Sequence, residues 1–240
     1  MNYYFITGTG RGIGRALAEH LLQNENNFVY GLSRSNEISH ENFQHIQIDL
    51  NKVNEVKNYE FPEVKNSESI ILINNAASSG EVKHLGKRDQ DLIISDYNVN
   101  IISPSLIMNS FLKSYQNENC KRVILNVSSG AGKRAIESWS IYCSSKSALE
   151  MISEVTALEQ KLKHSDNPVH IFAVGPGVVD TKMQDELRKV NPDDFSMVGQ
   201  FIEFKEKGEL ADPKDIAIKL TQIIADPDKF DKVSFSVKDF

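Results

Sequence analysis

The chain has 240 residues, of which 40% are hydrophobic and 25% charged, and its formal net charge is −6. These values are ordinary for a globular protein with a full apolar core, and the negative charge argues against a nucleic-acid or anionic-membrane surface. No apolar run approaches the roughly 20 residues that span a bilayer.

Cysteine and histidine content excludes two further classes. The two cysteines, Cys120 and Cys143, fit neither a disulfide framework nor a zinc site. The six histidines show no spacing typical of metal ligands, so we expect no metal site. The chain runs directly into an apolar, strand-like segment with no signal-peptide pattern, and we expect a protein of the reducing cytoplasm.

Segments typical of strands alternate with segments typical of helices along the chain. Strands are expected at 2–7, 28–33, 44–48, 69–74, 121–127, 168–174 and 232–237, and long helices at 12–24, 89–115, 139–164 and 212–226. Such alternation predicts βαβ units with right-handed crossovers. We therefore predict an α/β fold: a single Rossmann-type, doubly wound domain over residues 1–240, with a seven-stranded parallel sheet flanked by helices.

A glycine-rich turn joins the first expected strand to the first helix. Its sequence is Gly8-Thr9-Gly10-Arg11-Gly12-Ile13-Gly14. In this context Gly8 allows a tight turn, Gly12 allows close approach of a pyrophosphate, and Gly14 allows close helix packing. The free N–H groups at the start of the helix would face the phosphates. The alternative, a flexible glycine loop, does not explain the flanking strand and helix.

The second expected strand ends at Ser33-Arg34. A site that prefers NAD usually places Asp or Glu about 20 residues beyond the glycines, where it binds the ribose hydroxyls. Here that position is Arg34, and no acidic residue appears before Glu37. A guanidinium can bind a 2′-phosphate through two hydrogen bonds, and Arg11 adds a second positive charge. The sequence therefore predicts NADP(H); the alternative is two solvated surface arginines.

Tyr142 and Lys146 lie four residues apart on an expected helix, downstream of Ser129. Positions i and i+4 share one helix face. A positive charge about 4 Å from a phenol favours the phenolate by about 4 kcal/mol at an effective dielectric of about 20. A tyrosine activated in this way can exchange a proton with a ketone or an alcohol. On spacing alone a surface pair is the simpler interpretation, but the glycine-rich turn reverses that balance.

Residues 178–210 interrupt the alternation of strands and helices. They carry bulky apolar side chains among polar ones, namely Met183, Phe195, Met197, Phe201, Ile202 and Phe204. Methionine and aromatic side chains suit a pocket for a flat or aromatic ketone. The alternative is that they anchor the segment to the core, and both interpretations stay open. Trp139 is another candidate pocket wall, with core packing as its alternative.

Together these features resemble the short-chain dehydrogenase/reductase family over the whole chain. The matching motifs are Thr7 to Gly14 (TGxxxGxG), Asp49-Leu50, Asn74-Asn75-Ala76-Ala77 (NNAG, with Ala replacing the final Gly), Asn100, Ser128-Ser129, Tyr142 to Lys146 (YxxxK), Gly175-Pro176-Gly177 and Thr181. In family members residues at the positions of 178–210 cover the substrate.

The resemblance implies a role for each catalytic residue. Tyr142 would be the acid/base, and Lys146 would lower the tyrosine pKa and hold the nicotinamide ribose. Ser129 would hydrogen-bond the substrate oxygen, because the offset to Tyr142 favours it over the competing Ser128. Asn100 would position a water that links Lys146 to solvent.

The resemblance also implies contacts to NADP(H). They are Gly8, Gly10, Arg11, Gly12, Ile13, Gly14, Ser33, Arg34, Asp49, Leu50, Asn75, Ala76, Ala77, Tyr142, Lys146, Pro176, Gly177, Val179 and Thr181.

The C-terminal third resembles the branch of sepiapterin reductase and bacterial benzil reductase, in residues 176–184 and 205–210. This branch implies that NADPH reduces a ketone or vicinal diketone to a chiral alcohol. Pterin-reducing members hold the pterin with an acidic residue near the C-terminus. Here the matching position is Ser236, with Asp239 displaced, so sepiapterin reduction is the alternative. A sensor of NADP(H) without turnover and a 3-oxoacyl reductase are further alternatives.

Family members commonly pair through two long helices, which implies a homodimer or a homotetramer here. The apolar residues available for pairing are Ile101, Ile102, Leu106, Ile107, Ala148, Leu149 and Ile152. The expected partners are thus a small-molecule carbonyl substrate and a second copy of the chain, with no nucleic acid and no membrane.

Overall fold

One parallel sheet forms the centre of the computed structural model, which covers residues 1–240. Its strands are β1 (Asn2–Thr7), β2 (Asn27–Ser33), β3 (Phe43–Gln47), β4 (Ser69–Asn74), β5 (Lys121–Val127), β6 (His170–Gly175) and β7 (Ser234–Ser236). The order is β3-β2-β1-β4-β5-β6-β7, and every neighbouring pair is parallel. The predicted doubly wound, seven-stranded fold is confirmed.

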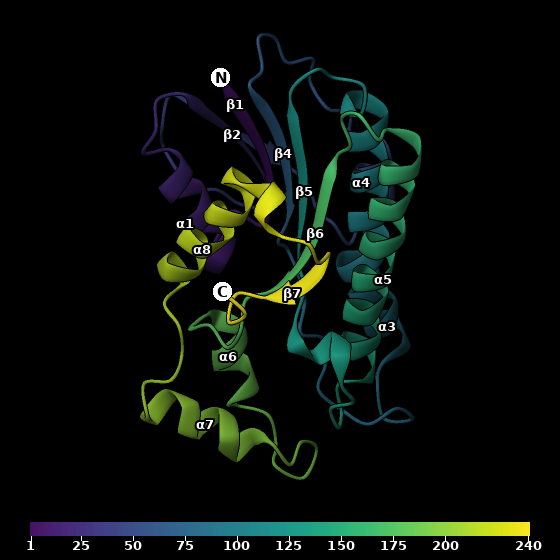
Figure 1. Ribbon diagram of the computed structural model, residues 1–240. Coiled ribbons are helices and arrows are strands. Elements are labelled where there is room, and N and C mark those ends of the chain that lie inside the picture. Colours follow the sequence, from purple (N-terminus) through teal and green to yellow (C-terminus); the bar gives the residue numbers. More distant parts are fainter.

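Helices cover both faces of this sheet. They are α1 (Gly12–Leu21), α2 (Val53–Lys57), α3 (Gln90–Tyr97), α4 (Ser103–Tyr115), α5 (Ser140–Lys163), α6 (Lys182–Leu187), α7 (Val198–Glu206) and α8 (Pro213–Ala225). In Figure 1, α1 and α8 lie on one face and α3, α4 and α5 on the other. α6 and α7, which the sequence did not predict, lie beyond the carboxyl ends of the strands.

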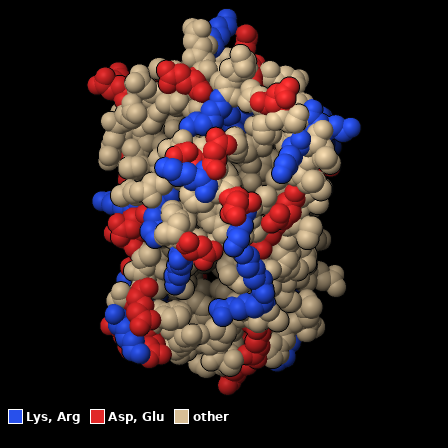
Figure 2. Space-filling model, viewed as in Figure 1, with Lys and Arg blue, Asp and Glu red and all other residues tan.

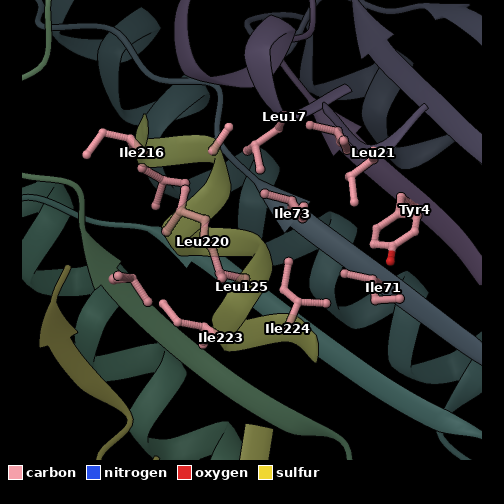
Figure 3. Close-up of a cluster of buried hydrophobic side chains, with 14 of the residues drawn as sticks. Tyr4, Leu17, Leu21, Ile71, Ile73, Leu125, Ile216, Leu220, Ile223 and Ile224 are labelled. Atoms are coloured by element: carbon pink, nitrogen blue, oxygen red, sulfur yellow. The ribbon is translucent and has the colours of Figure 1, made fainter. Parts of the chain in front are cut away.

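The layer between the sheet and the α1–α8 pair is apolar. Figure 3 shows side chains of α1 and α8 pointing toward those of the strands, among them Leu17, Leu220 and Ile73. All three are fully buried. Burying one such side chain stabilises the fold by roughly 1.5–3 kcal/mol. β4 is buried along its whole length, as expected of a central parallel strand covered on both faces.

The helix expected at 89–115 is interrupted. A π-helical stretch, Asn98–Ile102, separates α3 from α4, and α4 carries Pro104 in its first turn. Proline has no N–H, and its ring clashes with the carbonyl four residues earlier, so the chain widens ahead of it. This widening places Asn100 inside the protein, where it is 1% exposed.

Residues 178–210, here called the cover segment, leave the sheet after β6 and return before α8. Their base is closed by two backbone hydrogen bonds, from Asp180 N to Ala211 O (2.9 Å) and from Ala211 N to Val178 O (2.9 Å). The two ends of the cover segment are therefore joined to each other, with an isolated β-bridge between Val179 and Ala211.

Charges of both signs are interspersed over the face shown in Figure 2, which carries no large patch of one sign. Such a surface exerts little long-range attraction on a polyanion. None of the helices has the length and apolar character required to cross a bilayer.

Candidate active site

The glycine-rich turn lies at the carboxyl end of β1. Gly8 and Gly12 have positive φ angles of 78° and 58°, a region that glycine enters at low cost. A side chain at Gly14 would overlap Asn75 Nδ2 and the Gly8 carbonyl oxygen. Backbone geometry and packing thus require glycine at these positions.

Asn75 joins the ends of β1 and β4. Its Nδ2 donates to Thr7 O (3.0 Å), and its backbone N–H donates to Thr7 Oγ1 (3.0 Å). Ala76 N donates to the same hydroxyl oxygen (3.1 Å). The Asn-Asn-Ala-Ala motif therefore holds the glycine-rich turn in place, while Ala76 and Ala77, both partly exposed, stand at the strand end.

The start of α1 suits an anion. Arg11 occupies the N-cap position without a capping side-chain bond, and the first turn contains no acidic residue. The first N–H groups of a helix have no partner within the helix, and they favour negative charge. The N–H groups of Gly12, Ile13 and Gly14 therefore fit the diphosphate of a dinucleotide.

The charges around the end of β2 fit an additional phosphate. Arg11 and Arg34 are exposed, and neither takes part in an ion pair. Glu37 is the first acid after β2, and its Oε2 is paired with Arg15 Nη1 (2.5 Å). The carboxylate that would repel a phosphate is thus bound to a cation, while two guanidinium groups remain free.

Ser33 is buried beneath this turn. Its hydroxyl donates to Ser35 O (2.8 Å) and also bonds His45 Nε2 (3.1 Å) and Thr9 Oγ1 (3.2 Å). The Ser33 side chain therefore holds the turn that carries Arg34 and leaves no free hydroxyl for a cofactor.

The residues predicted after β3 are also placed at this edge. Asp49 is partly exposed, and its Oδ1 accepts the Asn51 N–H (3.0 Å). Leu50 is buried, and its carbonyl accepts the Ser103 hydroxyl (2.6 Å). The first bond is local to the turn after β3, and the second anchors that turn to the start of α4.

The turn after β6 reaches the glycine-rich turn. A side chain at Gly12 would lie 3.4 Å from Thr181 Cγ2. Thr181 is the N-cap residue of α6, but its side chain makes no capping bond, so the hydroxyl remains available. Pro176 and the exposed Gly177 precede it, and Val179 is buried beneath.

Three predicted catalytic residues converge between β5 and α5. The Ser129 hydroxyl lies close enough to the Tyr142 phenol to lower its pKa, and it accepts the Ala131 N–H (3.2 Å). Lys146 Nζ lies 5.8 Å from the centroid of the Tyr142 ring. Tyr142 and Lys146 are buried, at 7% and 2% exposure. The structure thus gathers a hydroxyl, a phenol and an amine in one buried cluster.

The protonation of this cluster differs from the expectation. Burial raises the pKa of Tyr142 to about 12, and the Ser129 hydrogen bond lowers this pKa only in part. Lys146, expected to lower the tyrosine pKa, instead donates to Val127 O (2.8 Å). Burial lowers the pKa of Lys146 itself to about 8. Desolvation therefore outweighs the ammonium, and Tyr142 is a protonated phenol at neutral pH.

Asn100 ties two parts of the site together. Its Oδ1 accepts the Ser78 N–H (2.8 Å), and its Nδ2 donates to Ser78 O (2.9 Å) and Ser145 Oγ (3.2 Å). Both amide protons are thus used within the protein. The amide holds the loop after β4 against α5, and it has no free N–H for the water that the family resemblance implies.

The cover segment contributes core to the site. Phe195 and Phe201 are buried, at 0% and 6% exposure. They pack on Trp139 at centroid distances of 5.8 and 6.0 Å, and Trp139 packs on Tyr142 at 4.9 Å. Of the two open interpretations, anchoring describes Phe195, Phe201 and Trp139, whereas Met183, Met197 and Phe204 are partly buried and Ile202 is exposed.

Sequence reasoning missed Ser78, Ser145 and Glu150. Ser78 and Ser145 have no motif of their own and are recruited by Asn100. Glu150 had a usable signal, because it lies four residues after Lys146 and so shares a helix face with it. Its carboxylate accepts the Ser128 hydroxyl (2.7 Å), so Ser129 is the serine whose hydroxyl stays beside Tyr142.

The sequence and fold are similar to those of known proteins. A family model described as short chain dehydrogenase matches residues 2–192. Benzil reductase ((S)-benzoin forming) of Bacillus cereus is 32% identical over 93% of this chain and 94% of its own. Bovine sepiapterin reductase is 29% identical over 72% of this chain and 62% of its own. A short-chain dehydrogenase/reductase structure from Saccharomyces cerevisiae superposes with a TM-score of 0.85 at 25% identity, covering 99% of this chain and 96% of that one.

Proposed function

Because the chain belongs to the short-chain dehydrogenase/reductase family, a family of oxidoreductases with nicotinamide cofactors, we propose that it is an NADPH-dependent carbonyl reductase. Its substrate would be a ketone or a vicinal diketone, reduced to a chiral alcohol. The observation that carries this proposal is the buried cluster of Ser129, Tyr142 and Lys146 at the cofactor edge of the sheet.

Tyr142 is in the protonated state that carbonyl reduction requires. When bound, NADPH supplies the hydride that the carbonyl carbon accepts. Tyr142, a protonated phenol whose pKa burial raises from 10.0 to about 12, donates its proton to the carbonyl oxygen. The Ser129 hydroxyl donates a hydrogen bond to the same oxygen as negative charge develops there. The ammonium of Lys146, 5.8 Å from the ring centroid, stabilises the phenolate that Tyr142 becomes.

Two features support NADP(H) over NAD(H). The N–H groups at the start of α1 would bind the diphosphate, and Arg11 and Arg34 would bind the 2′-phosphate. Neither guanidinium is neutralised by an acid, whereas Glu37 is paired with Arg15. An NAD-preferring site would need a free carboxylate at this position.

The C-terminal tail favours a diketone over a pterin. Asp239 is the acid closest to the position where pterin reductases hold the ring, but its Oδ2 accepts the Ser236 N–H (2.8 Å). The Ser236 hydroxyl donates to Gly175 O (3.2 Å). Both candidate pterin contacts are thus used in the turn that ends the chain, and sepiapterin reduction remains the alternative.

Oxidation of NADPH, followed by its absorbance, tests the proposal. We expect turnover with benzil that exceeds turnover with sepiapterin or an acyl thioester, and higher kcat/KM with NADPH than with NADH. Tight NADPH binding without turnover on any of these carbonyls would instead support a sensor. Faster turnover with NADH would contradict the proposed role of the two arginines.

We further propose a homodimer of a cytoplasmic protein. Four exposed apolar residues follow one another on a single face of α5, namely Met151, Val155, Leu158 and Leu162. Of the residues expected to pair, Ile107 and Leu149 are instead buried in the chain's own core, while Ile102 is 40% exposed.

The two free cysteines suit a reducing compartment.

Light scattering tests the pairing. We expect a mass of two chains for the wild type and of one chain for Leu158→Asp, because a charge on the apolar face cannot be buried unpaired. A mass of four chains would indicate the homotetramer, and a monomeric wild type would contradict the proposal.

A further inference from the structure

A carboxylate and a hydroxyl beside the catalytic cluster have no part in the proton transfer. Glu150 lies on α5, one turn beyond Lys146, and Ser128 precedes Ser129 at the end of β5. The Ser128 hydroxyl donates to Glu150 Oε1 across 2.7 Å. Ser128 is 2% exposed, whereas Glu150 is partly exposed. The bond therefore connects the buried end of the strand to the edge of the helix.

This bond has a neighbour of similar geometry. Lys146 Nζ donates to Val127 O (2.8 Å), so two consecutive residues of the strand end are bonded to two consecutive turns of α5. Ser129 is the next residue, and its hydroxyl reaches Tyr142 on the same helix. The strand end cannot shift along α5 without breaking one of these bonds and moving Ser129 away from the phenol.

We propose that Ser128 and Glu150 form a positioning pair for carbonyl reduction, in which the hydrogen bond sets the place of Ser129 and the carboxylate keeps Lys146 charged. This inference rests on the proposed function, because it concerns the same reaction. Neither residue touches the reacting atoms; both act through Ser129 and Lys146.

The charges around Lys146 support the second part. Burial lowers the pKa of Lys146 to about 8, and the negative charge of Glu150 raises this pKa in opposition. Tyr142 faces Lys146 from the same helix and is a neutral phenol at neutral pH. Lys133, in the turn Gly130–Lys133 that packs on α5, is directed to Ser234 O instead (3.5 Å). If the charge of Glu150 is removed, burial therefore acts on the pKa of Lys146 without opposition, and this pKa falls further.

Two variants separate the two parts of the proposal. Glu150→Gln removes the charge but keeps an oxygen that can accept the Ser128 hydroxyl. Ser128→Ala removes the hydrogen bond but keeps the charge. Glu154→Gln is the matched control, because it lies one turn further along α5 and is exposed.

The first readout needs neither cofactor nor substrate. The 13Cε resonance of Lys146, in protein labelled with 13C-lysine and assigned with Lys146→Arg, reports its titration. We expect the titration midpoint to fall in Glu150→Gln and to stay at the wild-type pH in Ser128→Ala and Glu154→Gln. A wild-type midpoint in Glu150→Gln would overturn the electrostatic part.

The second readout is kcat with NADPH and benzil as a function of pH. In Glu150→Gln we expect the alkaline loss of activity to begin at lower pH, because a charged Lys146 is required. In Ser128→Ala we expect kcat to fall about tenfold to a hundredfold, with the pH profile and the KM for NADPH unchanged. Wild-type kcat in Ser128→Ala would overturn the positioning part.

Thermal unfolding of each variant separates positioning from general destabilisation. If the activity of Ser128→Ala falls only because less of the protein is folded, so that kcat per folded molecule is unchanged, the proposal would also be overturned. If the wild type has no reductase activity, the proposed function fails, while the lysine titration still decides the electrostatic part.

Discussion

The glycine-rich crevice and the cover segment over it reach their geometry in different ways. In the crevice the backbone carries the function, through the positive φ angles of Gly8 and Gly12 and the free N–H groups of α1. In residues 178–210 the outcome depends on where bulky side chains go, and Phe195 goes into the core with 0% exposure. Motif spacing thus predicts a site made of backbone better than a pocket made of side chains.

The two regions also differ in how they are attached. The strands around the crevice are joined by continuous parallel ladders. The cover segment is held at its base and by Glu137, whose carboxylate accepts the N–H (3.2 Å) and the hydroxyl of Ser196 and lies 3.0 Å from His84 Nε2. These bonds lower the pKa of Glu137 to about 2. The Glu137 carboxylate that holds Ser196 therefore stays ionised in mildly acidic solution.

The largest expected effect lies on the crevice side. Tyr142→Phe removes the proton that the proposed reaction transfers to the carbonyl oxygen. We expect kcat to fall by roughly 10²–10⁴-fold, with NADPH affinity, measured by fluorescence titration, close to that of the wild type. Near-normal turnover would remove Tyr142 from the proton transfer.

The next effect lies in the cover segment and asks whether its aromatic residues are core. Phe195→Ala should lower the free energy of unfolding by about 3–5 kcal/mol, the usual cost of truncating a buried phenylalanine. Ile202→Ala, on an exposed residue of the same segment, should cost far less. Denaturant unfolding measures both. A changed KM for substrate without a loss of stability would instead make Phe195 a pocket wall.

A third measurement asks how much the burial of Lys146, on the crevice side, lowers the free energy of unfolding. Burial holds the pKa of Lys146 near 8, below its ordinary value of 10.5, so the folded state binds this proton less tightly than the unfolded state. The full cost therefore applies below pH 8 and fades as the pH rises to 10.5. Between pH 7 and 9 the unfolding free energy of the wild type should rise by about 1.4 kcal/mol relative to Lys146→Met. A constant difference would contradict the lowered pKa.

The smallest expected effect concerns cofactor choice. Arg34→Ala removes one of the two free guanidinium groups near the proposed 2′-phosphate, so we expect the KM for NADPH to rise about tenfold, while the KM for NADH changes little. Lys65→Ala, an exposed cation at the opposite ends of the strands, is the control. An equal rise of both KM values would place Arg34 at a part of the cofactor common to NADH and NADPH.

Much of the fold followed from the sequence. All seven strands were predicted within two residues of their ends. The signal was strongest in β4 and β5, where runs of Ile, Leu and Val are bounded by polar residues. The helix at 89–115 was predicted without its π-helical break, although Pro104 marked the place. α6 and α7 were missed because their periodicity is short and mixed with polar residues.

The sequence by itself determined the order of strands and helices, the glycine-rich turn and the spacing of Tyr142 and Lys146, since each depends on neighbours along the chain. Only the tertiary structure decided the protonation of the cluster and the fate of the aromatic cover residues. Those depend on burial, and burial is set in part by segments distant in sequence, as where Phe195 packs on the Trp139 ring that covers Tyr142. Desolvation then raises the pKa of the phenol more than any local motif lowers it.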